Sequence, residues 1–323
     1  MKRDEIIDIC KGIGILLVIL GHLDVPFGKI IYAFHMPLFF YLSGRCFSDR
    51  YLDNKISFIK KRFITLLIPV VVFEGGIKFL LSDNAYNSII TPNNIFGTYW
   101  FLKALFVISI MYLYSLCLIR RKKWSNYVIP LGYLISTFVL SILISVDSQT
   151  IMGKLIHYIY MASFFALGYS DKSLKMLYNE TESTVPFKRM GGVIFALLII
   201  AYTYKGGVDM GRTSMENYIQ YAIGGILGIC LTVYVSKLIS KSKMCKIFTY
   251  FGQYTLSIML FHFAVFFLID ILIETICVTN VPLYIVKTIK IIGALFIPIC
   301  VNDTYHYISE IITKKIQIIW IQK

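Results

Sequence analysis

Residues 8–44 constrain the fold of this chain most strongly. Two apolar runs of membrane-spanning length follow each other across a short turn, and they read D-I-C-K-G-I-G-I-L-L-V-I-L-G-H and I-I-Y-A-F-H-M-P-L-F-F-Y-L-S-G. On a helix, Asp8, Lys11 and His22 share one face. Each ionisable side chain in a spanning segment costs about 2.5–3.5 kcal/mol. We therefore expect this face to line a bundle interior or a watery cavity instead of lipid.

The composition indicates an integral membrane protein. Apolar residues make up 57% of the 323 residues and charged residues 15%, whereas charged residues are about 25% of ordinary soluble domains. The net charge of +14 does not indicate nucleic-acid binding, because Lys and Arg occur in short clusters between apolar runs. The seven cysteines lie far apart without a C-x-x-C spacing, so we predict neither a disulfide framework nor a metal site.

Ten apolar segments predict an all-α membrane protein with about ten transmembrane helices. Links rich in Lys and Arg alternate with links that contain neither residue, and the positive-inside rule then places both termini in the cytoplasm. The rule places links without Lys or Arg on the outer side of the membrane. Among the links placed there, 206–216 fits the rule least well, since it carries Arg212. The rich links are 48–62, 120–125, 171–189 and 237–248, and the poor links are 82–98, 147–153 and 277–281. The segments are roughly 6–23, 29–47, 63–81, 99–119, 126–146, 154–170, 190–205, 217–239, 249–276 and 282–301.

The chain shows no internal repeat and no low-complexity tract, so we predict one transmembrane domain over residues 1–323. The stretch 302–323 combines lysines with isoleucines and Trp320, a pattern typical of an interfacial helix on the inner leaflet. The N-terminus resembles a signal peptide, but Asp8 and Lys11 interrupt its apolar run and no small-x-small site follows. We expect it to be retained as the first span of a multi-pass protein in the cytoplasmic membrane.

The predicted orientation separates the histidines from a basic cluster. Counting about 1.5 Å per residue puts His22 about 24 Å along the first span, near the outer end of a core about 30 Å thick. His35 starts the second span from the same side. The cytoplasmic edge carries the cations, and clustered cations there could bind phosphates, although ordinary positive-inside topology is the favoured explanation before any resemblance is considered. These cations are Arg45, Lys60, Lys61 and Arg62.

Five blocks of sequence carry a family resemblance. They are K-G-I-G-I-L-L-V-I-L-G-H ending at His22, F-H-M-P-L-F-F-Y-L-S-G over 34–44, K-K-R-F over 60–63, Y-W-F-L over 99–102 and F-G-Q-Y-T-L-S-I-M-L-F-H over 251–262. Together they resemble the membrane-bound acyltransferase-3 family, in its fucose 4-O-acetylase-like branch. The resemblance implies a bacterial O-acetyltransferase that moves an acyl group, usually acetyl, from cytoplasmic acyl-CoA to a sugar hydroxyl in a surface polysaccharide or its lipid-linked precursor.

The resemblance also implies roles for single residues. His22 falls on the family's essential histidine, which suits a general base for an alcohol nucleophile. Lys11 stands where the family usually has arginine, and Thr65 stands where it tends to have the second arginine of R-x-x-R, so the planar guanidinium fork is missing at both positions. Asp8 and Lys11 lie far below His22, so any support from them acts through the long-range field, water or other helices. A packed, structural histidine is the alternative for His22.

Five more side chains have open assignments. His35 is predicted to orient the acceptor or to share protons with His22, or else to form a structural hydrogen bond beside Pro37. His262 is predicted to line the cavity near substrate or to be structural. Trp100 belongs most simply to an interfacial belt, and Lys103 could contact a thioester carbonyl or an acceptor hydroxyl. Glu74 needs a partner, for which Lys78 one turn further is sufficient.

Two other functions remain open. A transporter or flippase of a glycan or small molecule would also have many spans with buried charges, although carriers often show paired halves that this sequence lacks. A sensory or binding module that kept the fold without turnover is compatible with Lys11 and Thr65. The expected partners of the enzyme are acyl-CoA with its phosphates at the inner face, a glycan or lipid-linked sugar, and the bilayer, but not nucleic acid. The sequence does not indicate an oligomeric state.

Overall fold

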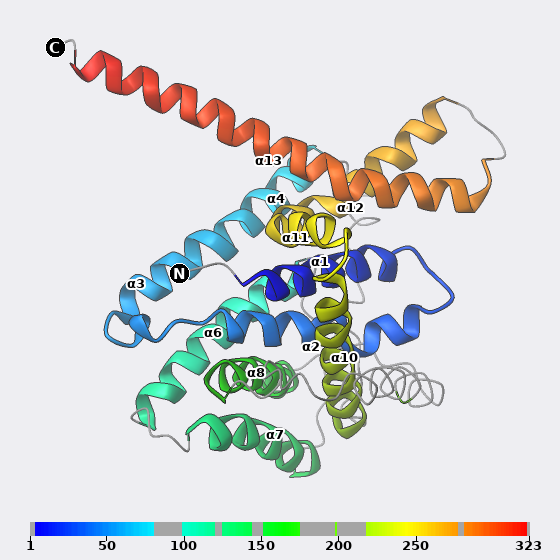
Figure 1. Ribbon diagram of the computed structural model, residues 1–323. Helices are drawn as coiled ribbons and strands as arrows, with labels where there is room; N and C mark the ends of the chain where they lie inside the picture. Colours follow the sequence, from blue (N-terminus) through cyan, green and yellow to red (C-terminus); the bar gives the residue numbers. More distant parts are fainter. Residues whose placement is uncertain are drawn as a thin grey trace.

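The computed structural model describes residues 4–80, 99–119, 125–143, 151–174, 198, 218–276 and 281–321 (Figure 1). Every secondary-structure element in these ranges is a helix, which confirms the all-α prediction. Within the described residues, four helical stretches are long and apolar enough to cross a membrane, namely Trp100–Leu118, Tyr221–Ile239, Thr255–Thr275 and Leu283–Tyr305. The count of ten spans and the side of the termini stay predictions. The predicted segment 190–205, apart from residue 198, and links 82–98 and 206–216 lie outside the described residues, as does most of link 171–189.

The first two apolar runs form an antiparallel pair at the centre of the bundle. Helix α1 spans Glu5–Gly21 and helix α2 spans Gly28–Arg45. Asp4 caps α1 by accepting a hydrogen bond from the Ile7 backbone amide at 3.4 Å. Both helices are buried on several sides, because α1 packs against α2, α10, α11 and α12 while α2 also packs against α8 (Figure 1). This central position explains why the carboxylate of Asp8 on α1 is buried within protein.

The basic link after α2 folds into short helices. A 3₁₀ turn, η1, covers Asp49–Leu52, and α3 covers Lys55–Arg62. The chain then continues through one π-helical stretch, η2 over Phe63–Leu67, into α4 over Ile68–Leu80. The side chain of Thr65 donates to the Lys61 carbonyl at 2.9 Å within this stretch. The expected third span, 63–81, therefore begins with a widened turn, a feature that is frequent at functional sites.

Helices α6, α8 and α10 pack against the central pair, and α7 packs on the outer side of α8 (Figure 1). These four helices span Trp100–Leu118 (α6), Ser125–Leu143 (α7), Ile151–Leu174 (α8) and Tyr218–Ile239 (α10). Glycines allow α2 and α8 to pack at backbone distance. A Cβ atom on Gly44 would overlap the Phe165 carbonyl, and one on Gly168 would overlap the Tyr41 carbonyl. Small residues at helix crossings are the usual means of close packing in membrane bundles. The α2–α8 contact therefore fixes the position of the C-terminal end of α2. The sequence predicts that this end lies on the cytoplasmic side.

The apolar segment predicted over 249–276 is divided into two helices. Helix α11 spans Cys245–Gln253, Tyr254 follows it, and α12 spans Thr255–Thr275. The 28 residues would exceed a core of about 30 Å as one straight helix, at about 1.5 Å per residue. The break lies where α11 crosses α1, since a Cβ on Gly252 would overlap the Asp8 carbonyl.

The last helix, α13, runs from Leu283 to Ile321 without interruption and projects beyond the rest of the bundle (Figure 1). It continues the tenth predicted segment directly into the stretch 302–321. The stretch predicted as an interfacial helix is therefore helical and continuous with the span before it. Its placement on a membrane surface stays a prediction.

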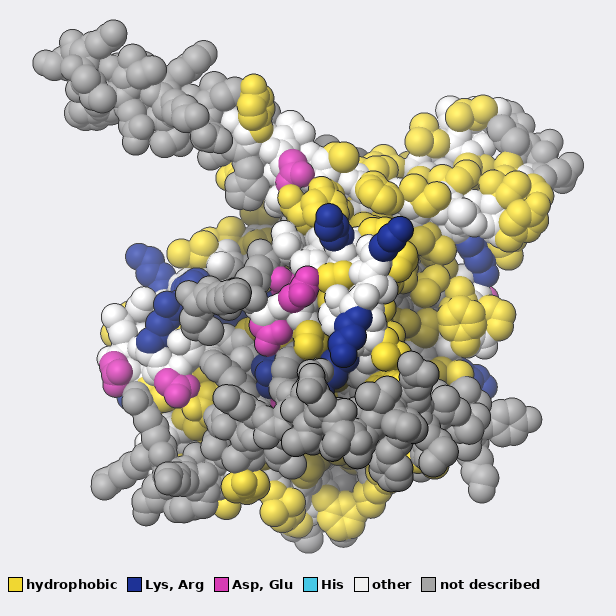
Figure 2. All heavy atoms as spheres, in the orientation of Figure 1, with side chains coloured by type: hydrophobic (Ala, Val, Ile, Leu, Met, Phe, Trp, Pro, Cys, Tyr) yellow, Lys and Arg dark blue, Asp and Glu magenta, His cyan; other side chains and the backbone are white. Residues whose placement is uncertain are grey.

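Two basic surfaces appear on one face of the molecule. Figure 2 shows Lys and Arg side chains over α3 and, separately, where α10 meets α11. The sequence assigned both of these links to the same side of the membrane. The side of the membrane on which these links lie stays a prediction.

Candidate active site

His22 and His262 form an imidazole pair. His22 is the C-cap of α1, and its ring stacks on His262 of α12 with centroids 5.4 Å apart and an interplanar angle of 26°. Phe263 also packs on His22, at 4.6 Å between ring centroids. The side chain of His22 is exposed, whereas His262 is only 3% exposed. The sequence identified both histidines but did not bring them together.

The ring of His262 is held in a defined orientation. Its Nδ1 lies 2.9 Å from the Met259 carbonyl and 3.2 Å from the Ile258 carbonyl. A carbonyl oxygen can only accept, so we assign the proton to Nδ1 in the neutral ring. Nε2 then carries a lone pair, and this atom is buried without a hydrogen-bond partner in the part of the chain that the structure describes. The position of the lone pair is fixed by the backbone of α12.

A cavity of about 240 Å³ lies between α1, α2, η2, α6, α11 and α12. Of its lining residues, Met259 is three residues before His262, and Leu66 is four residues after Arg62. The lining is mainly apolar, and Lys11 contributes its charged side chain. The cavity therefore extends from the helix turn after the basic cluster to the helix turn before the imidazole pair.

Lys11 lines the cavity and Asp8 pairs with it, both far from His22. The Lys11 ammonium is 3.7 Å from Asp8 Oδ1, and the side chains are 29% and 4% exposed. Eleven residues of helix separate Lys11 from His22, which is about 16 Å along the axis. This agrees with the expectation that neither side chain touches His22. Their catalytic roles stay predictions, and a contact of Lys11 with a molecule in the cavity is compatible with its position.

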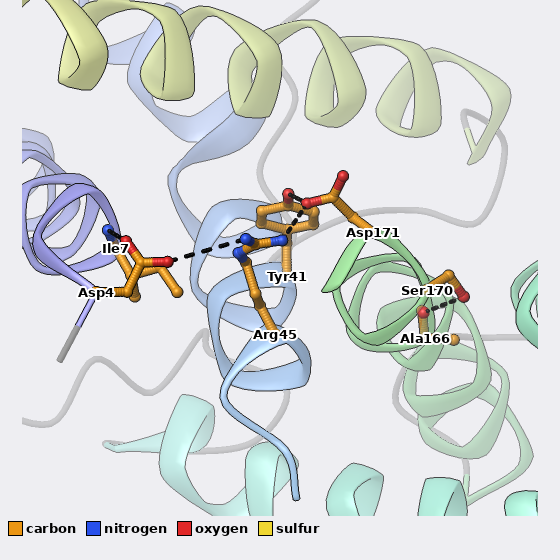
Figure 3. Close-up of polar contacts among 7 residues, drawn as sticks. All are labelled: Asp4, Ile7, Tyr41, Arg45, Ala166, Ser170 and Asp171. Carbon is orange, nitrogen blue, oxygen red and sulfur yellow. Dashed lines mark hydrogen bonds and ion pairs between the residues drawn. The ribbon is translucent and has the colours of Figure 1, made fainter. Parts of the chain in front are cut away.

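Arg45 is part of a buried cluster of charges, which we call the Arg45 cluster and define as Asp4, Tyr41, Arg45 and Asp171 (Figure 3). The guanidinium is 8% exposed, and it donates a short hydrogen bond to Asp171 and lies 3.9 Å from Asp4. Tyr41 donates to the same Asp171 oxygen at 2.7 Å. The charge of Arg45 is thus compensated within the protein. Its predicted role in phosphate binding remains a prediction.

The other cations of the predicted phosphate site are more accessible. Lys60 and Lys61 are exposed, and Arg62 is half-buried with its guanidinium 5.2 Å from the ring centroid of Phe58. Lys61 also donates to the Tyr51 hydroxyl at 3.2 Å. Hydrogen bonds from Arg50 and from Lys61 lower the pKa of the Tyr51 phenol from its ordinary value. This end of α3 therefore presents positive potential to the surface.

His35 has the contacts of a structural histidine. It is 4% exposed, and its Nδ1 lies 2.8 Å from the Ile31 carbonyl in the preceding turn. Its ring packs edge-on against Tyr32 at 5.3 Å, and Tyr32 donates to the Gly21 carbonyl at 2.9 Å. His35 is therefore linked to the residue before His22 through one aromatic side chain. Orientation of the acceptor by His35 stays a prediction.

Lys103 and Trp100 lie at the start of α6, close to α4 and α12. Lys103 donates to Glu74 at 2.7 Å and is therefore a partner of Glu74, whereas the side chain of Lys78, expected from spacing, lies outside the described residues. The pair is only partly buried, with side chains 33% and 26% exposed. Trp100 is half-buried and packs on Phe101. Contact of either residue with substrate stays a prediction.

Tyr99 makes a contact with α12 that was not predicted from the sequence. Its hydroxyl donates to the Leu260 carbonyl of α12 at 2.9 Å, and its backbone is in the left-handed region at φ 56°. A non-glycine residue in this region usually marks a structural constraint. The bond holds the beginning of α6 against the turn of α12 that carries His262. The Y-W-F-L block was the available signal, but it does not indicate which helix Tyr99 contacts.

Comparisons with known proteins agree with the motifs. The family described as "Acyltransferase domain" matches residues 4–300. Nodulation protein NolL of Mesorhizobium japonicum is 31% identical over 131 residues, which cover 34% of this chain and 35% of that protein. Nodulation protein NolL of Sinorhizobium fredii is 34% identical over 124 residues, which cover 32% of this chain and 34% of that protein. The match thus spans about a third of the length of these relatives. No solved structure matches the chain.

Proposed function

Since the chain belongs to the acyltransferase-3 family, whose domain covers residues 4–300, we propose that it is a membrane O-acyltransferase. The donor is acyl-CoA, with acetyl or another small acyl group. The acceptor is a hydroxyl of a sugar in a surface polysaccharide or in its lipid-linked precursor. The observation that carries this proposal is the cavity between the basic end of α3 and the imidazole pair.

The cavity suits part of the donor instead of the whole molecule. Sites that hold drug-sized ligands occupy about 300–1,000 Å³. A volume of about 240 Å³ is too small for a nucleotide with its arm, but it suits a narrow, mostly apolar arm ending in a thioester. The phosphates of CoA would stay at the exposed cations Lys60 and Lys61 and at Arg62, where clustered donors favour phosphate. Lys11 would contact the arm as it passes.

His22 is the proposed general base. It removes the hydroxyl proton as the sugar oxygen attacks the acyl carbonyl carbon. A C–O bond forms and the C–S bond to CoA breaks. The proton on His22 then passes to the departing thiolate, so that CoA leaves as a thiol and His22 returns to its neutral form.

The proposal is tested by radiolabelled acetyl-CoA added to membranes that contain the chain, followed by measurement of label in the glycan fraction. Label is expected to enter glycan, and His22→Ala is expected to lower the rate about 100-fold or more, as removal of a general base does. The matched control is His157→Gln, because His157 is a buried histidine of α8 that bonds the Gly153 carbonyl at 3.2 Å. A wild-type chain that never labels glycan would support the transporter alternative and contradict the proposal.

A further inference from the structure

We propose that His262 is a positioning residue that accepts a hydrogen bond from His22 when His22 carries the hydroxyl proton. The inference rests on the proposed function, and it adds a second imidazole to a site in which the sequence indicated one general base. In this scheme Nε2 of His262 is the acceptor. The proton stays on His22 until it is passed to the leaving thiolate.

The first argument is the hydrogen-bonding state of His262. Its Nε2 is buried and has no hydrogen-bond partner among the described residues. A buried polar atom left without a partner is costly, by about 1–3 kcal/mol. Such atoms are rare in folded proteins and call for an explanation. An acceptor that is used only when a neighbouring imidazole becomes charged provides one.

The second argument is that the acceptor is rigid while the donor is adjustable. The His262 ring is fixed by the carbonyls of Met259 and Ile258, and the next residue, Leu260, accepts from Tyr99. His22 is exposed and follows the last turn of α1, at the C-cap. Its ring can therefore rotate from the stacked arrangement, with centroids 5.4 Å apart, into one with an N–H directed at Nε2.

The third argument is the chemistry of the rings that contact His22. Its ring stacks on His262 and packs on Phe263. Phe263 has no hydrogen-bonding atom in its side chain, so of these two rings only the imidazole can accept a hydrogen bond. Carboxylates usually support a catalytic histidine, as in serine hydrolases. In the proposed scheme a neutral imidazole has that role, and the exposed Asp24, two residues beyond His22, is the carboxylate that a control variant tests.

Three substitutions of His262 separate the possible roles of its ring. His262→Gln can place an acceptor oxygen near the position of Nε2. His262→Asn can replace only the donor at Nδ1 that bonds the backbone. His262→Phe keeps the aromatic stack on His22 and removes both nitrogens. Each variant is purified in detergent, its folding is checked by its elution and thermal transition, and kcat and KM for acetyl-CoA are measured with saturating acceptor.

We expect His262→Gln to retain kcat within about threefold of wild type. His262→Asn and His262→Phe should lose kcat by about 100-fold, the low end of the contribution of acid–base groups, with KM for acetyl-CoA unchanged. The control Asp24→Asn should leave kcat unchanged. If the Phe variant does not fold, the comparison of Gln with Asn alone decides.

Other outcomes overturn the inference. Recovery in His262→Asn but not in His262→Gln would show that the bond to the backbone is what matters. Full activity in His262→Phe would show that packing is sufficient, and a large loss in Asp24→Asn would transfer the role to a carboxylate. All of these require an active wild type. A wild type that transfers no acyl group contradicts the proposed function itself, and with it this inference, so the two failures are distinguishable.

Discussion

The Arg45 cluster and the imidazole pair are both made from helices far apart in sequence, but the first pairs opposite charges and the second pairs two imidazole rings. In the Arg45 cluster, one buried guanidinium contacts two carboxylates, and Tyr41 completes the contact at Asp171. In the imidazole pair, Nε2 of His262 has no partner in the described part of the chain. A compensated charge holds helices together, whereas an uncompensated lone pair is available for chemistry.

The difference also assigns the two clusters to different tasks. The Arg45 cluster joins the N-terminal end of α1, the end of α2 and the end of α8 (Figure 3). The imidazole pair lies at the opposite end of α1, on α12. Helices α1, α2 and α12 all line the cavity. The Arg45 cluster fixes α1 and α2, and the imidazole pair connects the end of α1 with α12. The four predictions below test this division, beginning with the largest effect.

The largest effect is expected on removing one partner of the Arg45 cluster. Asp171→Ala leaves a buried guanidinium without its main counter-ion, which typically costs about 3–5 kcal/mol of folding free energy. Thermal unfolding in detergent and the yield of folded protein measure this loss. The double variant Arg45→Met with Asp171→Leu replaces both charges by apolar groups, and it should recover most of the stability.

The same double variant tests the predicted phosphate role of Arg45. If Arg45 only holds helices, KM for acetyl-CoA in the double variant should equal that of wild type. A large rise in KM with restored stability would instead show that the buried guanidinium reaches the donor. That result would contradict the division between a structural and a chemical cluster.

The second effect concerns Gly44, which precedes Arg45 at the α2–α8 contact. Gly44→Ala introduces a Cβ that overlaps the Phe165 carbonyl, and overpacking of this kind costs about 1–3 kcal/mol. The control is Gly132→Ala in α7, where nothing lies within 4 Å of the added Cβ. The control should be neutral or slightly stabilising, since Ala favours helix over Gly. Equal transition temperatures for both variants would show that close packing does not hold α2 in place.

The third effect concerns the exposed cations of α3. Lys60→Gln, Lys61→Gln and Arg62→Gln together should raise KM for acetyl-CoA about tenfold, which is about 1.4 kcal/mol, with kcat unchanged. The control removes the same number of charges from the link between α10 and α11 and the first turn of α11, by changing Lys241, Lys243 and Lys246 to Gln. Equal increases in KM in both triple variants would indicate general surface potential and not a phosphate site.

The smallest effect concerns the bond from Tyr99 to Leu260. Tyr99→Phe removes one hydroxyl and should lower stability by about 1 kcal/mol, the usual net contribution of a hydrogen bond. We also expect a loss of kcat of a few fold, because the turn that carries His262 becomes less fixed. Tyr127→Phe, at an exposed position of α7, serves as the control. A kcat of Tyr99→Phe equal to that of the control would separate this bond from the chemistry.

Much of the fold was predictable, because the length of an apolar run can be determined from the local sequence alone. The runs predicted as 6–23 and 29–47 are α1 and α2, and the runs predicted as 99–119 and 217–239 are α6 and α10 within a few residues. The break between α11 and α12 at Tyr254 was not predicted, since an apolar sequence does not indicate where its helix crosses another helix. The close approach of Gly252 to Asp8 decides that position.

The partners within the site could not be predicted, because they depend on helix packing. His22 meets His262, Arg45 meets Asp171, and Glu74 meets Lys103. Each pair joins two helices, and the period of 3.6 residues predicts only which side chains share a face of one helix. That limit explains why Lys78 was expected beside Glu74 and why His262 was considered separately from His22.

The most direct test of the account is an experimental structure of the chain in lipid with acetyl-CoA bound. The account predicts CoA phosphates against Lys60, Lys61 and Arg62, the arm in the cavity beside Lys11, and the thioester next to the imidazole pair. Acetyl-CoA bound elsewhere, with the cavity filled by its own side chains or by lipid, would contradict it.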